Sequence, residues 1–248
     1  MVITYIHHSS FLAELSGMYL LFDYTEGEIP PLKAEKPLLV FASHRHGDHF
    51  SPRIFDLAKS HPLIRYVLSD DIFASRIPAQ LDAVTDQFGP GEIIRLELPG
   101  RGKDMPDAGE QEVEIHTFRS TDEGVAFLIA AEGSVIYHAG DLNDWVWEGE
   151  PEEDNRKMHE AYMKELRNIA DTKLLPDVAF VPLDPRQEQD FYLGMDEFMH
   201  VVGAKTVFPM HFWGDFSVTA KLRALPCAES YHGQLVELHY DGETFQVQ

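Results

Sequence analysis

Short apolar runs recur along most of the chain, and their length predicts β-strands. Leu38–Ala42 is apolar at every position, which is typical of a strand that is buried on both faces. The pairs Ser16-Gly17 and Asp241-Gly242 are turn signals that predict hairpins between the runs on either side. The predicted strands are Val2–Ile6, Phe11–Leu15, Met18–Phe22, Leu38–Ala42, Ile64–Leu68, Glu92–Leu98, Glu112–Phe118, Val125–Ala130, Val135–His138, Val178–Val181, Thr206–Phe208, Leu235–Tyr240 and Thr244–Val247.

Longer segments with spaced apolar positions predict helices between these strands. Ser51-Pro52 supplies an N-cap followed by proline at the first helical position, and the helix continues to about Lys59. Each half of the chain begins with strands and then alternates strands with helices, which favours an α/β fold of two packed sheets with helices outside. Pro99–Gly109 is predicted to be a loop, and residues 1–248 are predicted to form one domain. The other predicted helices are Asp70–Ile77, Glu152–Ile169, Met195–Val202 and Ser217–Ala224.

The composition is that of a globular protein, and its cysteine content and charge exclude some folds and partners. The 248 residues, 44% of them hydrophobic, include a single cysteine, Cys227, which excludes a disulfide scaffold and a Cys-rich zinc module. The 20 basic and 42 acidic side chains give a net charge of −22, which disfavours nucleic acid and anionic membranes as partners. The N-terminal residues lack the pattern of a signal peptide, so we expect a cytoplasmic protein. The sequence does not specify the oligomeric state.

A histidine-rich loop, Ser43–His49, directly follows the strand Leu38–Ala42. Residues i and i+2 of an extended segment project the same way, so His44 and His46 can hold one metal ion together. Asp48 and His49 follow a glycine, where the backbone is free to turn. They can therefore reach a second position nearby, as two-metal hydrolytic sites require.

The spacing of these residues resembles a known signature. His44-x-His46-x-Asp48-His49 matches the His-x-His-x-Asp-His motif of the metallo-β-lactamase superfamily. The opening His7-His8-Ser-Ser-Phe11, followed by Leu20–Asp23, resembles the branch that contains ascorbate-phosphate lactonase and related predicted metal-dependent hydrolases. The resemblance implies a four-layer αββα sandwich of two mixed β sheets with helices outside.

Two later segments also resemble elements of that superfamily. Ile136–Asp141 is similar to the strand that ends in Gly-Asp, which implies that Asp141 bridges two metal ions. Phe208–His211 is similar to the strand end that carries the last histidine of the second metal site. The ligands that the resemblance implies are His44, His46, Asp48, His49, Asp141 and His211.

One element departs from the superfamily pattern. A third histidine of the first metal site is expected on the segment before the strand pair that leads to Gly-Asp, and here that segment is Ile115–Gly124. His116 lies inside the predicted strand, and Asp122 lies near the expected ligand position. Either His116 supplies the ligand with a shifted register, or Asp122 replaces it, or the first site lacks it and binds its metal more weakly.

Other candidates lie where the walls of the site are expected. His8 is expected to polarise a substrate oxygen or donate a proton, with a structural hydrogen bond as the alternative. Trp145 follows the Gly-Asp element and could close a substrate pocket, or shield the core. Arg186 would suit a phosphate or carboxylate through paired hydrogen bonds, with a structural salt bridge as the alternative. His138, within a predicted strand, is expected to pack rather than bind metal.

These residues favour a metal-dependent hydrolase of a small anionic ester, either a phosphodiester or a lactone. Its nucleophile would be a metal-bound hydroxide, oriented or deprotonated by Asp48. Imidazole and carboxylate ligands suit zinc first, with manganese or iron as alternatives, at one or two ions per chain. Two other functions stay open: an iron-dependent oxidoreductase of the same fold, and a non-catalytic binding protein with a degenerate first site.

Overall fold

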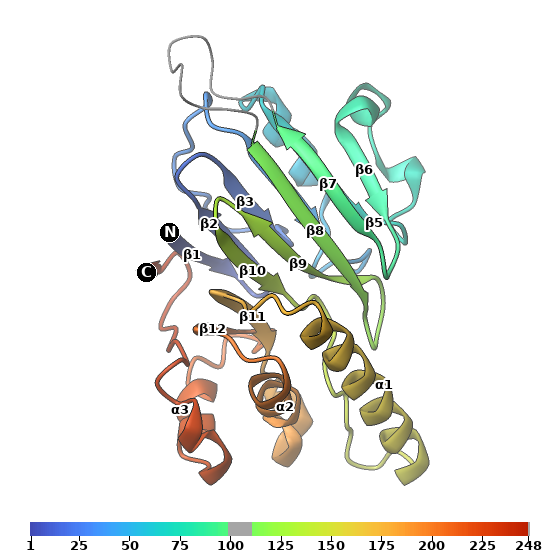
Figure 1. The fold of residues 1–248 in the computed structure, drawn as a ribbon, viewed down its shortest axis with the longest axis vertical. Helices are drawn as coiled ribbons and strands as arrows, with labels where there is room; N and C mark the ends of the chain where they lie inside the picture. The colour runs from blue at the N-terminus through green and yellow to red at the C-terminus, as the bar shows by residue number, and fades with distance from the viewer. Residues whose placement is uncertain (99–110, 248) are drawn as a thin grey trace.

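The computed structural model describes residues 1–98 and 111–247, so the predicted loop Pro99–Gly109 lies outside the described residues. The described strands form two sheets (Figure 1). In the first sheet the strand order is β13-β1-β2-β3-β4-β5-β6. Its strands are β1 Val2–His7, β2 Ser10–Glu14, β3 Tyr19–Phe22, β4 Leu38–Ala42, β5 Ile64–Ser69, β6 Thr85–Phe88 and β13 Thr244–Gln246.

The second sheet has the order β12-β11-β10-β9-β8-β7. Both sheets are mixed, because each joins an antiparallel half to a parallel half. The two mixed sheets with helices confirm the predicted sandwich. The strands of the second sheet are β7 Ile93–Leu98, β8 Gln111–Arg119, β9 Val125–Ala131, β10 Ser134–His138, β11 Val178–Pro182 and β12 Thr206–Met210.

The two sheets are covered by different kinds of helix. The α-helices gather on the side of the second sheet, where α1 and α2 contact β8 and β11 (Figure 1). The predicted helix at Pro52–Lys59 is a 3₁₀ helix, η1, and Ser51 caps it as expected. None of the helices in the described part of the chain is long and apolar enough to cross a membrane. The α-helices are α1 Glu152–Asp171, α2 Leu193–Val201 and α3 Val218–Arg223, and the remaining 3₁₀ helices are η2 Ala74–Arg76, η3 Ala79–Val84, η4 Pro185–Asp190 and η5 Pro226–Ser230.

Two predictions near the sheet edges were wrong. The C-terminal hairpin does not form: residues 235–240 contain no strand, and β13 pairs antiparallel with β1. The turn at Asp241-Gly242 does form, but the Gly242 N–H donates to the Tyr5 carbonyl, so the segment covers the open edge of β1 instead. The prediction also missed β6, because its residues are polar and only half-buried at the edge of the sheet.

The core explains why β4 is apolar throughout. Leu39 and Phe41 belong to the large core between the sheets, where Phe11 of β2 stacks on Phe180 of β11 at 4.2 Å between ring centroids. Leu38 and Val40 point to the opposite face and pack with η1 in a second core. Both faces of β4 are therefore buried, as predicted.

The strand directions bring the carboxyl ends of several strands from both sheets to one side of the molecule. In the first sheet β1, β3 and β4 run in one direction, and in the second sheet β8, β10, β11 and β12 do so. The segments that follow these strands contain all the charged and histidine residues of the site described below. In open α/β sheets this carboxyl edge is where ligands bind.

Candidate metal centre

The histidine loop is held tightly against the end of β4. The amides of His49 and Phe50 both donate to the His46 carbonyl, which turns the chain back after His46. Two glycines allow neighbouring loops to approach it. A Cβ at Gly124 would lie 2.0 Å from the Ser43 carbonyl oxygen, and one at Gly140 would lie 2.7 Å from Ser43 Cβ, and both glycines have positive φ. The loops after β8 and β10 therefore reach the histidine loop only because these positions lack side chains.

Asp141 lies between two groups of candidate ligands. Its Oδ1 is 3.0 Å from His49 Nε2 and 3.5 Å from His211 Nε2, whereas its Oδ2 is 3.4 Å from His44 Nε2. Only 4% of the residue is exposed. Asp141 therefore has the position of a bridging carboxylate. We call His44, His46 and Asp122 the first half-site, and Asp48, His49 and His211 the second half-site.

The two histidines of the second half-site are buried and held in place by carboxylates. Asp48 Oδ2 lies 3.6 Å from His211 Nε2 and 4.0 Å from His49 Nε2. His49 Nδ1 donates to Asp23 at 2.7 Å, and His211 Nδ1 donates to Asp184 at 2.9 Å. The Nε2 of each imidazole therefore faces the site, where it can bind a metal ion once its proton is lost. Carboxylate–imidazole pairs of this kind orient metal ligands in proteins.

The first half-site is more open. His44 is fully buried, but the side chains of His46 and Asp122 are 42% and 49% exposed. His46 Nδ1 lies 3.0 Å from His44 Nε2 and 3.7 Å from Asp122 Oδ2. Burial, together with the charge of Asp141, raises the pKa of Asp122. Of the three alternatives for the missing ligand, the geometry favours Asp122.

His116 lies elsewhere. It sits within β8 opposite Ile93 and Leu128, and its Nε2 is 2.8 Å from Glu114. It belongs to none of the groups of ligand atoms that converge in the described residues. His138 is also used structurally, because its Nε2 donates to the Ser9 carbonyl and its Nδ1 accepts from the Gly140 amide.

Several buried polar atoms of the site have no hydrogen-bond partner among the described residues. They are His8 Nε2, His49 Nε2, His211 Nε2 and Asp141 Oδ1. Buried polar atoms are rarely left without a hydrogen bond, so these atoms fit a bound ligand. The converging groups are His8 with the second half-site, His44 with His46 and Asp48, His44 with His49 and Asp141, and His46 with Asp122 and Asp141. This set of imidazoles and carboxylates fits divalent metal ions.

The charges of the site support the same interpretation. Burial disfavours ionised Asp141, but His49 and His211 outweigh it and bring the pKa of Asp141 well below its ordinary value. Burial also opposes protonation of His49, yet the Asp141 and Asp23 carboxylates raise its pKa well above 6.5. The protons that these imidazoles hold between carboxylates are those that a metal ion displaces when it binds.

The remaining candidates line two cavities that meet at Asp48. A cavity of about 300 Å³ is lined by both half-sites, Trp145 and Arg186. Trp145 donates to the Asp141 carbonyl and packs 5.5 Å from the His211 ring. Asp184 occupies the Nε and Nη2 side of Arg186, so that side of the guanidinium is not available to a substrate anion.

His8 lies on the other side of Asp48. Its Nε2 is 3.6 Å from Asp48 Oδ2, and its ring is 4.5 Å from that of His211. With Asp48 and Trp213 it lines a second cavity of about 630 Å³. Burial lowers the pKa of His8, which leaves a neutral imidazole beside the site.

Asp23 and Asp184, the carboxylates that brace the second half-site, were not predicted from the sequence. Asp23 also accepts from the Ser43 amide and hydroxyl, and so ties β3 to the histidine loop. A signal was present, because each residue follows an apolar strand at the carboxyl edge that carries the ligands.

Comparison with known proteins is consistent with this geometry. The family model described as β-lactamase superfamily domain matches residues 2–211. The chain belongs to this superfamily. A relative from Opitutus terrae, named UPF0173 metal-dependent hydrolase, is 27% identical over all of both chains. A relative of the same name from Thermococcus kodakarensis is 23% identical over 85% of this chain and 84% of its own. The prediction of a metal-dependent hydrolase of this superfamily is thereby confirmed.

Solved structures also share the fold. Igni18, described as a novel metallo hydrolase from Ignicoccus hospitalis, aligns with a TM-score of 0.62 at 17% identity, over 100% of this chain and 99% of its own. The metallo-β-lactamase fold protein YhfI from Bacillus subtilis aligns with a TM-score of 0.62 at 14% identity, over 99% of each chain. At these identities the alignments support the sandwich architecture alone.

Proposed function

We propose that this superfamily member hydrolyses a small anionic ester, a phosphodiester or a lactone, at a centre that holds two divalent metal ions. The observation that carries the proposal is the convergence of imidazole and carboxylate atoms from both half-sites around Asp141. Of these, His49 Nε2, His211 Nε2 and Asp141 Oδ1 are buried without a hydrogen-bond partner among the described residues. The first half-site with Asp141 would hold one ion, and the second half-site with Asp141 would hold the other. When bound, such ions lower the pKa of water toward about 7 and stabilise negative charge that develops on the substrate.

The charge balance favours an anion. The ligands include three carboxylates, those of Asp48, Asp122 and Asp141, and the imidazoles are neutral when they bind metal. Two divalent ions therefore leave the centre with one net positive charge. Arg53 adds a cation to the wall of the second cavity, and no acid of the described residues lies within ion-pair distance of it. A long polyanion is disfavoured, because the whole chain carries a charge of −22.

The protein's own groups would position the reactants. The Asp48 carboxylate would accept a hydrogen bond from the attacking water and orient it toward the ester. His8, whose Nε2 is buried and unpartnered, would donate to a substrate oxygen on the side of the second cavity. The indole of Trp145 would exclude bulk water from the first cavity.

The test is a substrate screen with protein loaded separately with Zn²⁺, Mn²⁺ and Fe²⁺. Bis(p-nitrophenyl) phosphate, p-nitrophenyl phosphate and a phosphorylated sugar lactone would be compared at equal concentration. We expect turnover of the diester or the lactone, zinc as the preferred metal, and loss of activity in Asp48→Asn. Oxygen consumption by the iron-loaded protein without hydrolysis would support the oxidoreductase instead. Metal loading without turnover of any ester would contradict the proposal and favour a binding protein.

A further inference from the structure

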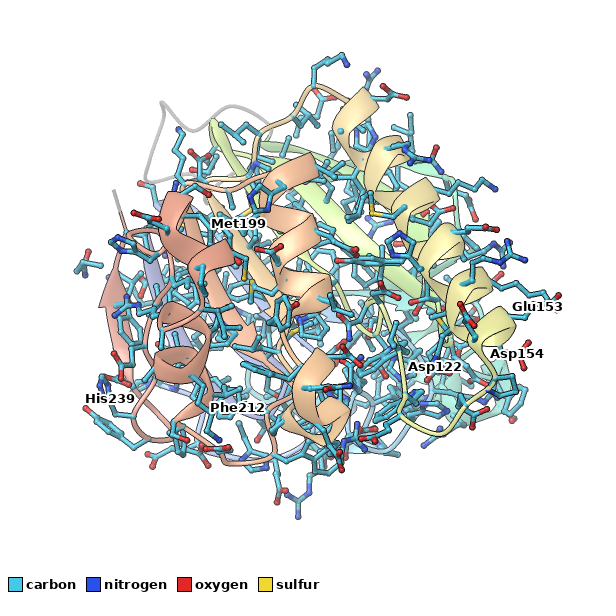
Figure 2. The ribbon with its side chains drawn as sticks, turned by 90° about the horizontal axis from the view of Figure 1, so that it is seen from below. Asp122, Glu153, Asp154, Met199, Phe212 and His239 are labelled. Carbon is cyan, nitrogen blue, oxygen red and sulfur yellow. The ribbon has the colours of Figure 1, made fainter. Side chains whose placement is uncertain are left out.

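A third cluster of metal-binding side chains lies outside both half-sites. It consists of Asp144, on the loop after Asp141, His159 of α1 and Glu197 of α2. His159 Nδ1 is 2.9 Å from Asp144 Oδ2 and 3.2 Å from Glu197 Oε1. One ligand atom from each residue lies within 4.8 Å of the others. Figure 2 shows α1 and α2 side by side, as this cluster requires.

Close packing of α2 brings the three residues together. A Cβ at Gly194 would lie 1.8 Å from the Asn143 side-chain oxygen and 3.1 Å from the Asp144 amide nitrogen, so α2 rests directly on the loop. The Tyr162 hydroxyl donates to the Gly194 carbonyl at 2.7 Å and ties α1 to the same point. Glu197 lies three residues after Gly194, and His159 lies three residues before Tyr162. Both therefore occupy the helix faces that meet at Asp144.

The cluster contains buried polar atoms without a hydrogen-bond partner among the described residues. Asp144 is 1% exposed, and its Oδ1 is one of these atoms. Glu197 Oε2 is also buried without a partner. Burial raises the pKa of Glu197 to about 7, and the neighbouring Asp144 carboxylate adds to this effect. Two carboxyl groups are thus buried beside one imidazole, and no Lys or Arg of the described residues forms an ion pair with either acid.

We propose that Asp144, His159 and Glu197 form a third divalent metal site, separate from the catalytic centre. One imidazole and two carboxylates suit Zn²⁺ or Mn²⁺, and water would complete the coordination because the His159 side chain is 45% exposed. Two carboxylates and a neutral imidazole balance the charge of one divalent ion. The ion would fix the loop that carries Asp141 and Trp145 to α1 and α2.

The test counts metal ions in full-length protein that is stripped with chelator, dialysed against ZnCl₂ or MnCl₂, and analysed by mass spectrometry of the elements. We expect His159→Ala and Glu197→Gln each to hold one ion fewer per chain than the wild type. The matched control is His200→Ala. Like His159, His200 is half-exposed and faces an acid, Asp196, but it lies on α2 outside the cluster. This control should keep the wild-type metal content.

A second background separates this site from the catalytic centre. In Asp141→Asn, where the catalytic centre is disabled, we expect one bound Zn²⁺ to remain and to raise the melting temperature. Adding His159→Ala to that variant should abolish both the ion and the shift in melting temperature. Equal metal content in the wild type, His159→Ala and Glu197→Gln would overturn the proposal and assign the cluster to a proton shared between Asp144 and Glu197.

Discussion

The two half-sites of the metal centre differ in how the protein supports them. In the second half-site His49 and His211 are 0% and 3% exposed, and the buried carboxylates of Asp23 and Asp184 hold them in place. In the first half-site His46 and Asp122 are half-exposed, and their closest atoms are 3.7 Å apart. A rigid ligand loses less conformational entropy when it binds a metal ion, so the two positions should differ in affinity.

The difference implies an order of loading. The second half-site presents its imidazoles in the correct orientation before metal arrives, whereas the first must order His46 and Asp122 at the surface. We therefore expect the second half-site to fill first and to release its ion last. The same contrast accounts for the missing superfamily histidine, since a carboxylate on an exposed loop can still approach an ion that His44 and His46 hold.

The largest effect on both half-sites is expected when the residue that they share is replaced. Asp141→Asn should abolish binding at both and lower kcat/KM by about 10³-fold or more, because bound metal supplies several kcal/mol of transition-state stabilisation. Metal analysis in a His159→Ala background, where no ion is expected at the third site, and hydrolysis of the best ester from the screen would measure both effects. Retention of one tightly bound ion at the second half-site would show that Asp141 does not bridge.

The contrast also separates what the sequence could predict from what it could not. The spacing of His44, His46, Asp48 and His49 after an apolar strand predicted the centre, because strand and loop geometry bring close neighbours in sequence to one place. The alternating strands and helices likewise predicted two packed sheets, and the resemblance to the superfamily implied that both are mixed. These inferences depend on local periodicity, which the sequence records directly.

Contacts between distant segments were not predictable in the same way. Asp23 and Asp184 brace histidines that lie 26 and 27 residues away along the chain, and no local pattern marks that pairing. The pairing of β13 with β1 joins the two ends of the chain, whereas the local turn signal favoured a hairpin. Asp122 could be preferred to His116 only when the register of β8 placed His116 beside Glu114.

The next test weakens only the braced half-site. Asp184→Asn keeps the shape of the side chain but removes the charge that orients His211, and we expect metal affinity at the second half-site to fall about 10–100-fold. Titration of stripped protein with Zn²⁺ would measure this change. Asp215→Asn is the matched control, because Asp215 lies on the segment that follows His211 but binds Lys221 and Ser217. An equal loss in both variants would contradict a specific role for the Asp184–His211 pair.

A third test addresses the open half-site. Asp122→Asn should lower the metal affinity of the first half-site by about tenfold, because it removes one carboxylate charge. The ion at the second half-site should stay bound. Glu123→Gln is the matched comparison, because Glu123 Oε2 lies 3.5 Å from His46 Nε2, whereas Asp122 faces His46 Nδ1. Stoichiometry at limiting Zn²⁺ would distinguish the variants. A weaker ion in Glu123→Gln but not in Asp122→Asn would transfer the ligand role to Glu123.

The smallest expected effect concerns His116, the alternative ligand. His116→Ala should leave the metal content unchanged and lower the free energy of unfolding by less than about 1 kcal/mol, because the His116–Glu114 pair is partly exposed. The hydrogen bond from His116, together with that from Arg95, lowers the pKa of Glu114 below 4.5. This stabilisation is present above pH 4.5 and is lost as the pH falls through the lowered pKa.

Urea unfolding of stripped wild-type and His116→Ala proteins at pH 7 and at pH 3 would measure the effect. The difference in stability should be present at pH 7 and smaller at pH 3, where Glu114 is increasingly protonated. Use of metal-free protein keeps ligand binding out of the comparison. A loss of one metal ion in His116→Ala would instead mean that β8 shifts its register when metal binds, and the first half-site would then be a three-histidine site like that of the superfamily pattern.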